Sequence, residues 1–261
     1  MASPVVRDST LRSHCESVER VITAMRDQMD QPMTLQQMAR IGFASRYHFN
    51  RTFRQITGVP PLQFLYALRI DAARRLLTQT QKKVIDICYE VGYNSIGSFT
   101  RRFVDVMGVS PTNLRKLARN RNGASAARLN PHTGGGAEPG AQVEGYIHAP
   151  EDFCGRVAVG LFTTPIPQGK PVSCAMLEGA GPYSLEGVPE GEFYLFAVGL
   201  THSPAHGSAC FDHASALRAG GQPIRFAGNS IRGDTSLTLR PPSQFDPPVL
   251  LVVPQEKLQV V

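Results

Sequence analysis

Hydrogen-bonding and cationic side chains gather in two short segments, residues 45–57 and residues 95–107, at spacings that place them on one side of a helix. Guanidinium and amide groups can form two hydrogen bonds at once, which is the chemistry that reads base edges and holds phosphates. A solvated helix face is the ordinary alternative for surface arginines. The candidate residues are those expected to face solvent. They are Arg46, Tyr47, Asn50, Arg51 and Arg54 in the first segment and Ile96, Gly97, Ser98, Thr100, Arg101 and Arg102 in the second.

An internal repeat with an offset of fifty residues favours the first of these two interpretations. The stretch from Gly42 to Ser45 aligns with the stretch from Gly92 to Ser95 without a gap, and identical residues follow in the same register. Chance rarely matches turn, cap and core positions together. The identical pairs are Phe49 and Phe99, Arg51 and Arg101, Phe53 and Phe103, Gly58 and Gly108, Val59 and Val109, and Pro61 and Pro111.

Each copy of the repeat is predicted to form a helix, a tight turn and a second helix. Thr34 followed by Gln37 is a capping-box pattern that opens a short helix, and Gly42 offers the permissive backbone of a sharp turn. Ser45 and Ser95 are the expected N-caps of the second helices. The expected buried positions are Leu35, Met38, Ala39, Phe49, Phe53 and Ile56 in the first copy and Ile85, Cys88, Val91, Phe99, Phe103 and Val106 in the second.

A longer helix is expected between the two copies, over residues 61–77, because apolar residues recur there at helical spacing. Proline at position 61 suits the first turn of this helix. Its polar side is predicted to carry Arg69, Arg74 and Arg75.

Residues 14–117 resemble the DNA-binding domain of the AraC/XylS family of transcription regulators. The resemblance is carried by the repeat and, in the second copy, by Ile87, Gly92, Tyr93, Phe99, Arg101, Phe103, Gly108, Ser110 and Pro111. It implies two helix-turn-helix units whose second helices enter successive major-groove segments of double-stranded DNA. It also implies regulation of transcription through RNA polymerase, more often by activation than by repression.

The resemblance also assigns roles to individual residues of the two second helices. The base-reading positions that it implies are Tyr47, Asn50 and Arg51 in the first unit and Ile96, Gly97, Ser98 and Arg101 in the second. Ile96 and Gly97 offer no side-chain hydrogen-bond donors. The second unit is therefore expected to read DNA shape, a thymine methyl group, or little beyond phosphate.

Charge is divided unequally along the chain. Residues 1–128 hold 20 Lys and Arg against 9 Asp and Glu, a net charge of +11, whereas residues 129–261 hold 7 against 12, a net charge of −5. Nucleic-acid binding by release of counterions favours a basic surface. A generally basic soluble protein would not predict this segregation.

The C-terminal half changes to apolar residues at every second position, which predicts short strands and a β-sandwich. The stretch from Glu144 to Val198 resembles the prealbumin-like modules of carboxypeptidase regulatory domains, and one helix is expected near His213 to Ala219. The predicted strand positions are Val143, Gly145 and Ile147; Val157, Val159 and Leu161; Phe193, Leu195 and Ala197; Ile224 and Phe226; Leu237 and Leu239; and Val249 to Val253.

The sequence thus predicts an all-α double helix-turn-helix domain followed by an all-β, sandwich-like domain. A capping-box pattern at Ser13 and Glu16 opens the first helix. Proline, glycine and few apolar residues mark a flexible linker between the domains. The expected boundaries are an unstructured segment at 1–12, a DNA-binding domain at 13–118, a linker at 119–141 and an effector or interaction domain at 142–261.

The C-terminal half shows no catalytic constellation, so the chain is expected not to be an enzyme and to need no cofactor. Metal-ligand types occur at His202, His206, Cys210, Asp212 and His213, but their spacing matches no established pattern, so no metal site is predicted. Alternate aromatic residues of the β half, namely Tyr183, Phe193, Tyr194 and Phe196, fit either a core or a small-molecule pocket. The core interpretation is preferred for Phe193, and both remain open for Tyr194.

Composition places the protein in the cytoplasm, away from a membrane. No apolar run approaches the length of a membrane span, and the N-terminus lacks a signal-peptide pattern. The five cysteines are widely spaced without a C-x-x-C pair, which indicates reduced thiols.

Two functions remain open at this point. In the first, a DNA-binding transcription regulator uses its C-terminal domain to sense a small-molecule effector, to dimerise or to contact another protein. In the second, a ligand-binding, glycan-binding or enzymatic C-terminal module is joined to a DNA-binding switch. The lack of a catalytic constellation favours the first. The operator sequence, the effector and the oligomeric state do not follow from the sequence.

Overall fold

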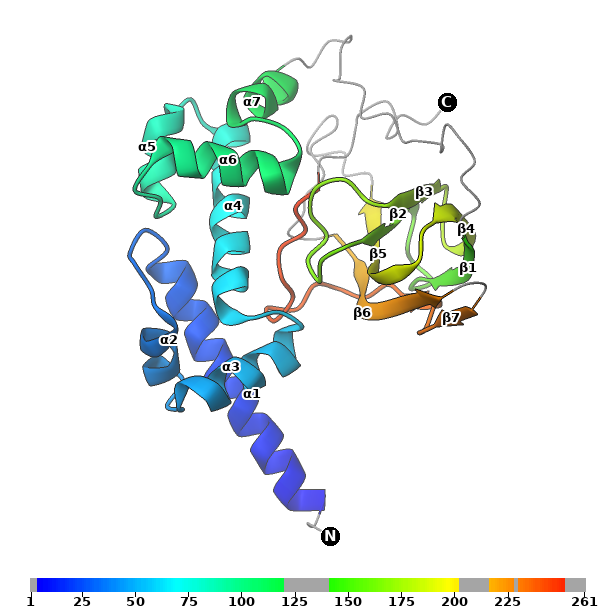
Figure 1. Cartoon of the computed structure of the whole chain (residues 1–261), viewed down its shortest axis with the longest axis horizontal. Helices are drawn as coiled ribbons and strands as arrows, with labels where there is room; N and C mark the ends of the chain where they lie inside the picture. The colour runs from blue at the N-terminus through cyan, green and yellow to red at the C-terminus, as the bar shows by residue number, and fades with distance from the viewer. Residues whose placement is uncertain (1–3, 120–140, 202–215, 228–229, 252–261) are drawn as a thin grey trace. The chain divides into compact units, whose positions relative to one another are not determined.

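The computed structural model describes residues 4–119, 141–201, 216–227 and 230–251. All helices of the described chain lie within residues 4–119, called here the helical unit, and all its strands lie within residues 141–251, called the β unit (Figure 1). This order of an all-α and a sheet-rich region confirms the predicted fold class.

The first helix, α1 (Pro4–Asp27), begins earlier than the sequence predicts. Residues 1–12 are expected to be unstructured, yet the helix already includes residue 4, and Ser13 lies inside it instead of capping it. Proline suits the first turn of a helix, where an amide donor is not needed, and neither glycine nor a further proline follows before Asp27. The fully buried side of the helix comprises Val18, Val21, Ile22 and Met25.

The first helix-turn-helix unit consists of α2 (Leu35–Ile41) and α3 (Arg46–Thr57). The predicted capping box is present, because the Thr34 side chain accepts a hydrogen bond from the Gln37 amide while the Gln37 side chain accepts one from the Thr34 amide. Ser45 caps α3 as predicted, accepting a hydrogen bond from the His48 amide at 3.4 Å. The backbone of both helix starts is therefore satisfied locally.

The second helix-turn-helix unit repeats this arrangement with α5 (Val84–Glu90) and α6 (Ile96–Met107). Ser95 accepts a hydrogen bond from the Ser98 amide at 3.4 Å, as Ser45 does in the first unit. Cys88 is fully buried, as predicted, and burial raises the pKa of its thiol. Ile85 differs from the prediction because it is 43% exposed, and Ile87 takes its place in the core.

Two further helices begin at the predicted prolines, α4 at Pro61 (Pro61–Gln79) and α7 at Pro111 (Pro111–Arg119). Figure 1 shows α4 running between the two helix-turn-helix units. Aromatic rings connect α4 to the first unit, since the Phe64 ring lies edge-on to Phe53 with 5.5 Å between centroids. The helix α4 therefore shares a hydrophobic core with α3.

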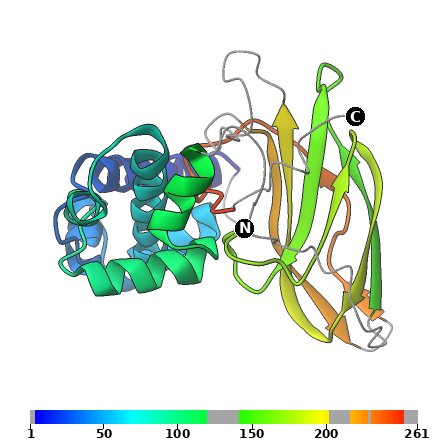
Figure 2. The same ribbon diagram turned by 90° about the horizontal axis from the view of Figure 1, so that it is seen from above.

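Two sheets make up the described part of the β unit, and Figure 2 shows their strands running side by side. Neighbouring strands are antiparallel except for β1 and β8, which are parallel. The smaller sheet has the order β4-β1-β8, with β1 (Ala141–His148), β4 (Gly181–Val188) and β8 (Leu237–Thr238). The larger has the order β3-β2-β5-β6-β7, with β2 (Gly155–Phe162), β3 (Ser173–Leu177), β5 (Gly191–Thr201), β6 (Arg218–Ala227) and β7 (Ser230–Arg232).

One hydrophobic cluster joins the two sheets of the β unit. Val143 and Leu185 of the smaller sheet and Val159 and Leu195 of the larger one belong to it, and the two strands of the smaller sheet alternate in burial. Phe193 is a member and is 6% exposed, which confirms its core interpretation. The packing of two sheets over one core is the sandwich-like arrangement that period-two spacing predicts.

Three details of the β unit differ from the sequence prediction. Strands β3 and β7 were not expected; β7 is exposed throughout and β3 has no fully buried residue, so neither shows the alternation that reveals a strand. Around Val249, the chain forms one bridge, between Leu250 and Gln168, instead of a strand. Residues 218 and 219, at the end of the expected helix, belong to β6.

Several predictions fall outside the described residues. They are the linker between Arg119 and Ala141, the metal-ligand types from His202 to His213, the first part of the helix expected there, and Val252 and Val253.

Truncation of Phe53 should destabilise the helical unit. Phe53 is fully buried, and its ring centroid lies 5.5 Å from those of Phe49 and Phe64. We expect Phe53→Ala to lower the free energy of unfolding by about 3 to 5 kcal/mol, because it leaves a cavity and removes both ring contacts. Phe43→Ala is the matched control, since that ring is 84% exposed, and its effect should stay within about 0.5 kcal/mol. Urea unfolding followed by helical circular dichroism measures both; equal effects would contradict this packing.

Alkaline pH should destabilise the β unit through Tyr183. Its hydroxyl donates a hydrogen bond to the Thr235 carbonyl oxygen at 2.7 Å, and burial, with a smaller contribution from the Asp234 carboxylate, raises its pKa to about 12. An unfolded tyrosine titrates near about pH 10, so the neutral phenol stabilises the fold fully below that pH. This stabilisation is lost as the pH rises from about 10 to about 12.

The Tyr183→Phe variant separates this effect from the titration of other groups. At pH 8 we expect the parent to be more stable by about 0.5 to 1.5 kcal/mol, the contribution of the hydrogen bond. Urea midpoints at pH 8 and pH 11 should show that this advantage shrinks at the higher pH. An advantage that is independent of pH would contradict the assignment.

Candidate nucleic-acid interface

The outward face of α3 carries the side chains that the sequence singled out in the first unit. Arg46, Arg51 and Arg54 are exposed, Tyr47 is 81% exposed, and Asn50 is half-buried. Five polar or cationic positions therefore lie on one helix within reach of solvent. Their chemistry suits contacts to base edges and phosphates.

Burial on the opposite side fixes which residues of α3 point outward. Phe49 and Phe53 lie one helical turn apart and are buried, with 5.5 Å between their ring centroids. Thr52 is also buried. Because these three residues share one side of the helix, rotation of α3 about its axis would bring arginine into the core.

The outward face of α6 is less polar than that of α3. Ile96 is 39% exposed, and Gly97 beside it contributes no side chain. Ser98 and Arg101 are exposed, whereas Thr100 is half-buried. The inward side repeats that of α3, since Phe99 and Phe103 are fully buried with 5.6 Å between their ring centroids.

Arg102, also a candidate in α6, has an intramolecular partner. Its guanidinium carbon lies 5.5 Å from the ring centroid of Tyr66 on α4, which places the cation over the ring. Such a contact restrains a long side chain. Arg102 is exposed nonetheless, so one face of its guanidinium remains in contact with solvent.

The turns of the two units differ in backbone although their sequences align. In the second turn, Gly92 has a φ of +84°, the left-handed conformation that glycine tolerates. In the first turn, Gly42 has a φ of −77° and the left-handed residue is Phe43, with a φ of +53°. The prediction that Gly42 supplies the permissive backbone is therefore wrong by one residue.

Close packing explains why position 42 still requires glycine. The Ser17 hydroxyl of α1 donates a hydrogen bond to the Gly42 carbonyl oxygen at 2.6 Å. A Cβ atom on Gly42 would lie 2.9 Å from that hydroxyl oxygen and 3.0 Å from the Phe49 ring. The turn is thus packed tightly against α1 and α3, and the residue with left-handed backbone is Phe43 instead of Gly42.

Phe43 is consequently an exposed aromatic residue beside the candidate interface, which sequence analysis missed. Its ring is 84% exposed, and the Arg20 guanidinium carbon of α1 lies 5.2 Å from the ring centroid. The aligned Tyr93 of the second unit instead packs on Phe99, with 5.3 Å between centroids. The alignment pairs an aromatic residue with an aromatic residue and therefore carries no signal of this difference.

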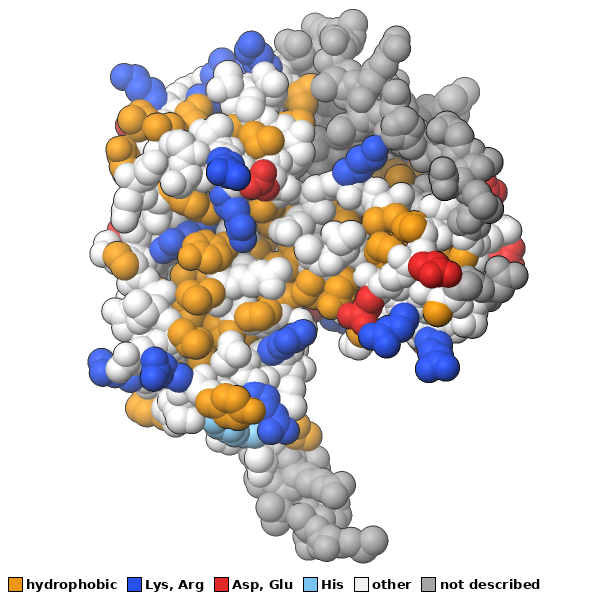
Figure 3. All heavy atoms as spheres, in the orientation of Figure 1, with side chains coloured by type: hydrophobic (Ala, Val, Ile, Leu, Met, Phe, Trp, Pro, Cys, Tyr) orange, Lys and Arg blue, Asp and Glu red, His pale blue; other side chains and the backbone are white. Residues whose placement is uncertain are grey.

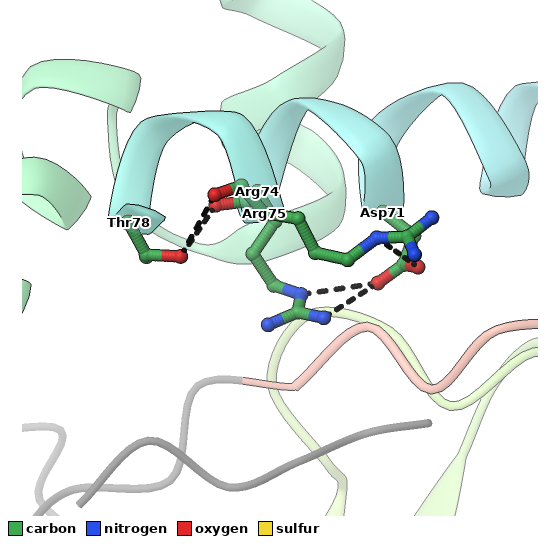
Figure 4. A network of polar contacts seen from close by, with 4 residues as sticks. All are labelled: Asp71, Arg74, Arg75 and Thr78. Carbon is green, nitrogen blue, oxygen red and sulfur yellow. Dashed lines mark hydrogen bonds and ion pairs between the residues drawn. The ribbon is translucent and has the colours of Figure 1, made fainter. Parts of the chain in front are cut away.

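The arginines of α4 do not share one polar side, contrary to the prediction. Arg69 is 7% exposed and donates hydrogen bonds to backbone carbonyl groups. Arg74 and Arg75 instead converge on the carboxylate of Asp71, at 2.8 Å and 3.4 Å (Figure 4). Only the latter two arginines lie on the partly exposed side.

Basic side chains are scattered over the visible surface of the helical unit, among hydrophobic and other side chains. Figure 3 shows Lys and Arg side chains distributed over the helical elements, with few Asp and Glu side chains among them. This distribution agrees with the net charge of +11 over residues 1–128. A surface of this kind attracts a polyanion.

Other kinds of site find little support among the described residues. No group of three or more His, Cys, Asp or Glu in that part of the chain could hold a metal ion. Tyr183 and Phe193 are core residues of the β unit. Phe196, another candidate for a pocket, packs edge-on against Phe162, and Tyr194 is half-buried. Of the helices that the structure describes, none is long and apolar enough to span a membrane.

Comparison with known proteins identifies relatives of the helical unit. Residues 19–117 match a family model described as a helix-turn-helix domain. An uncharacterized HTH-type transcriptional regulator of Haemophilus influenzae is 36% identical over 101 residues, covering 38% of this chain and 34% of the relative. The MmsAB operon regulatory protein of Pseudomonas aeruginosa is 32% identical over 101 residues, covering 39% and 33% respectively.

Among solved structures, a transcriptional regulator with an AraC-type DNA-binding domain from Chromobacterium violaceum is 23% identical, with a TM-score of 0.39. The alignment covers 41% of this chain and 96% of that one. The chain spans about a third of the length of the two relatives from Haemophilus and Pseudomonas. The family match coincides with the segment in which the repeat predicts two helix-turn-helix units, and it confirms that resemblance.

Proposed function

We propose, from the premise that residues 19–117 form an AraC-type helix-turn-helix domain, that this protein is a transcription regulator that binds specific sites in double-stranded DNA. The proposal is carried by the duplicated unit, in which each second helix buries two phenylalanines and turns a polar face outward. A helix of this kind fits a major groove. Two such helices would read two groove segments, one helical turn of about 34 Å apart.

Base reading by the first unit is assigned to Tyr47, Asn50 and Arg51. Arginine pairs with guanine through two hydrogen bonds and asparagine pairs with adenine in the same way, so both side chains suit the major groove. Arg46 and Arg54, at the two ends of the exposed face, are assigned to phosphates. Exposure of the arginines and of Tyr47 supports these assignments.

Weaker base reading is assigned to the second unit. Ile96 can contact a thymine methyl group, and Gly97 lets the helix approach the DNA closely without adding a donor. Ser98, Thr100 and Arg101 supply the hydrogen-bonding groups of this face. Arg102 is assigned to phosphate, because its position over Tyr66 restrains its reach.

The C-terminal β unit is assigned to sensing a small-molecule effector or contacting another protein, and the regulator is assigned to activation through RNA polymerase in the cytoplasm. The net charge of −5 over residues 129–261 makes this half a poor DNA ligand, which supports a separate role. A reporter gene placed behind the selected site distinguishes activation from repression by the sign of its response. A ligand- or glycan-binding module, or an enzyme, would be revealed by binding or turnover in the β unit.

The proposed DNA binding can be tested by selection from the host's fragmented genomic DNA with the full chain, followed by footprinting of the enriched fragments. We expect protection of about two helical turns on one face of the duplex. Affinity should fall steeply with salt, because each neutralised phosphate adds about 0.9 to the slope of log affinity against log salt. Failure to enrich any fragment at low salt would refute the proposal.

Arg51 and Arg54 should differ in the kind of DNA contact they make. We expect Arg51→Ala to cost about 1 to 3 kcal/mol on the selected site and to relax the preference at one base pair. Arg54→Ala should weaken binding to all sequences alike and reduce the salt slope by about one. Affinities on specific and random duplexes over a salt series measure both. Equal losses on both duplexes for Arg51→Ala would contradict base reading by that residue.

The two half-sites should contribute unequally to specificity. Because α6 offers Ile96 and Gly97 where donors would be needed, most base substitutions that weaken binding should fall in the half-site of α3. Arg101→Ala should be the most damaging substitution in α6. Binding measurements on every single-base variant of the site test this prediction, and equal sensitivity in the two half-sites would contradict it.

A further inference from the structure

Arg69 lies midway along α4, the helix between the two helix-turn-helix units. Its Nε atom donates a hydrogen bond to the Met29 carbonyl oxygen at 3.0 Å, and its Nη2 atom donates one to the Gln31 carbonyl oxygen at 2.8 Å. Both carbonyl groups belong to the segment between α1 and α2. The side chain therefore connects α4 to the segment that leads into the first unit.

The second unit reaches the same point through Gly92. A Cβ atom at this position would lie 2.4 Å from the Met29 carbonyl oxygen and 2.8 Å from the Arg69 guanidinium carbon. The backbone of the second unit is thus packed against the segment that precedes the first unit, with the guanidinium beside them. The residue must also be glycine for its φ of +84°.

The surroundings of Arg69 explain why its position is well defined. The residue is 7% exposed, and burial lowers the pKa of its guanidinium. Among the described residues it forms no ion pair, so the two carbonyl groups are its hydrogen-bond partners. Tyr93 and Tyr66 also face it and partly offset the effect of burial on its pKa, as does Asp30.

A planar fork is well suited to bridge two carbonyl groups in a fixed geometry. Arginine directs several N–H groups in one plane, whereas lysine presents a single compact ammonium on a flexible chain. A buried cation whose partners were lost would be costly, which opposes any movement that separates the segments. The guanidinium therefore opposes rotation of one unit about α4 relative to the other.

We propose that Arg69 is a positioning residue that fixes the two helix-turn-helix units relative to each other and thereby sets the spacing of the two DNA segments that the protein selects. The effect on spacing rests on the proposed function, whereas the effect on the units does not. α4 by itself fixes the distance along its axis. The contact among Met29, Arg69 and Gly92 fixes the rotation about that axis.

The first test measures the arrangement of the units without DNA. Spin labels at Gln55→Cys on α3 and Ser98→Cys on α6, both exposed positions, are introduced into the full chain with every native cysteine except buried Cys88 replaced by serine. We expect a narrow distribution of label distances in this parent. Arg69→Met, which removes the fork and the charge, should widen the distribution and shift its mean.

Two variants control for a general loss of structure. Arg75→Met removes an arginine from the same helix, but from a side chain that is 49% exposed, and should leave the distribution unchanged. Arg69→Lys retains the charge and should give an intermediate width. This variant decides the question if Arg69→Met does not fold. Equal widths for the parent and Arg69→Lys, or for the parent and a folded Arg69→Met, would overturn the proposal.

The second test measures the spacing preference on DNA. Duplexes carry the two selected half-sites with base pairs inserted or removed between them, and the affinity of the full chain is measured for each. The unlabelled chain of natural sequence, which is the parent in this test, should prefer one spacing. The Arg69→Met variant should lose about tenfold in affinity at that spacing and discriminate less among the others. A single half-site should be bound equally by both proteins.

The two tests separate the two proposals. If the parent binds no duplex, the proposed function fails, while the label distances still decide whether Arg69 positions the units. If the parent binds and Arg69→Met retains both its spacing preference and its affinity, the inference about Arg69 fails and the proposed function stands.

Discussion

The structure of the helical unit depends on the burial of two phenylalanines, one turn apart, in each second helix. Phe49 and Phe53 in α3, and Phe99 and Phe103 in α6, insert into the core at matching positions. Burial of such rings is among the largest single contributions to a small core. Once they are buried, the opposite face of each helix is determined, and arginine and other polar residues occupy it. The stabilising interactions thus also orient the surface proposed to meet DNA.

Much of this architecture could be predicted because local rules and burial agree. The capping box at Thr34, the N-caps at Ser45 and Ser95 and the N-terminal prolines of α4 and α7 each depend on a few neighbouring residues. The period-two pattern likewise indicated the inner strands of the β unit, where one face is buried. Edge strands such as β7 lack a buried face, so their sequence carries no such pattern.

The misplaced residues are those whose environment is set by distant parts of the chain. Arg69 looks like a surface arginine on a helical wheel, but its partners lie about forty residues earlier, at Met29 and Gln31. Phe43 aligns with a half-buried tyrosine, yet its own ring is exposed. In its turn Gly42 contacts Ser17, and the left-handed backbone occurs at Phe43. Neither the helical spacing nor the internal alignment indicates the partners of Arg69 or the exposure of Phe43. Of the candidate residues on α3 and α6, sequence spacing predicted the exposed arginines, whereas the position of Arg102 over Tyr66 required the structure.

The left-handed backbone at Phe43 has a consequence for how the two copies can vary. At Gly92 both space and backbone conformation exclude a side chain, at Gly42 space alone does so, and at Phe43 only the backbone is unfavourable. We therefore expect the two copies of the repeat to tolerate different substitutions at aligned positions. Glycine at position 92 therefore meets a stricter requirement than the aligned glycine at position 42. The backbone conformation thus differs between two turns that both begin with glycine and end with serine.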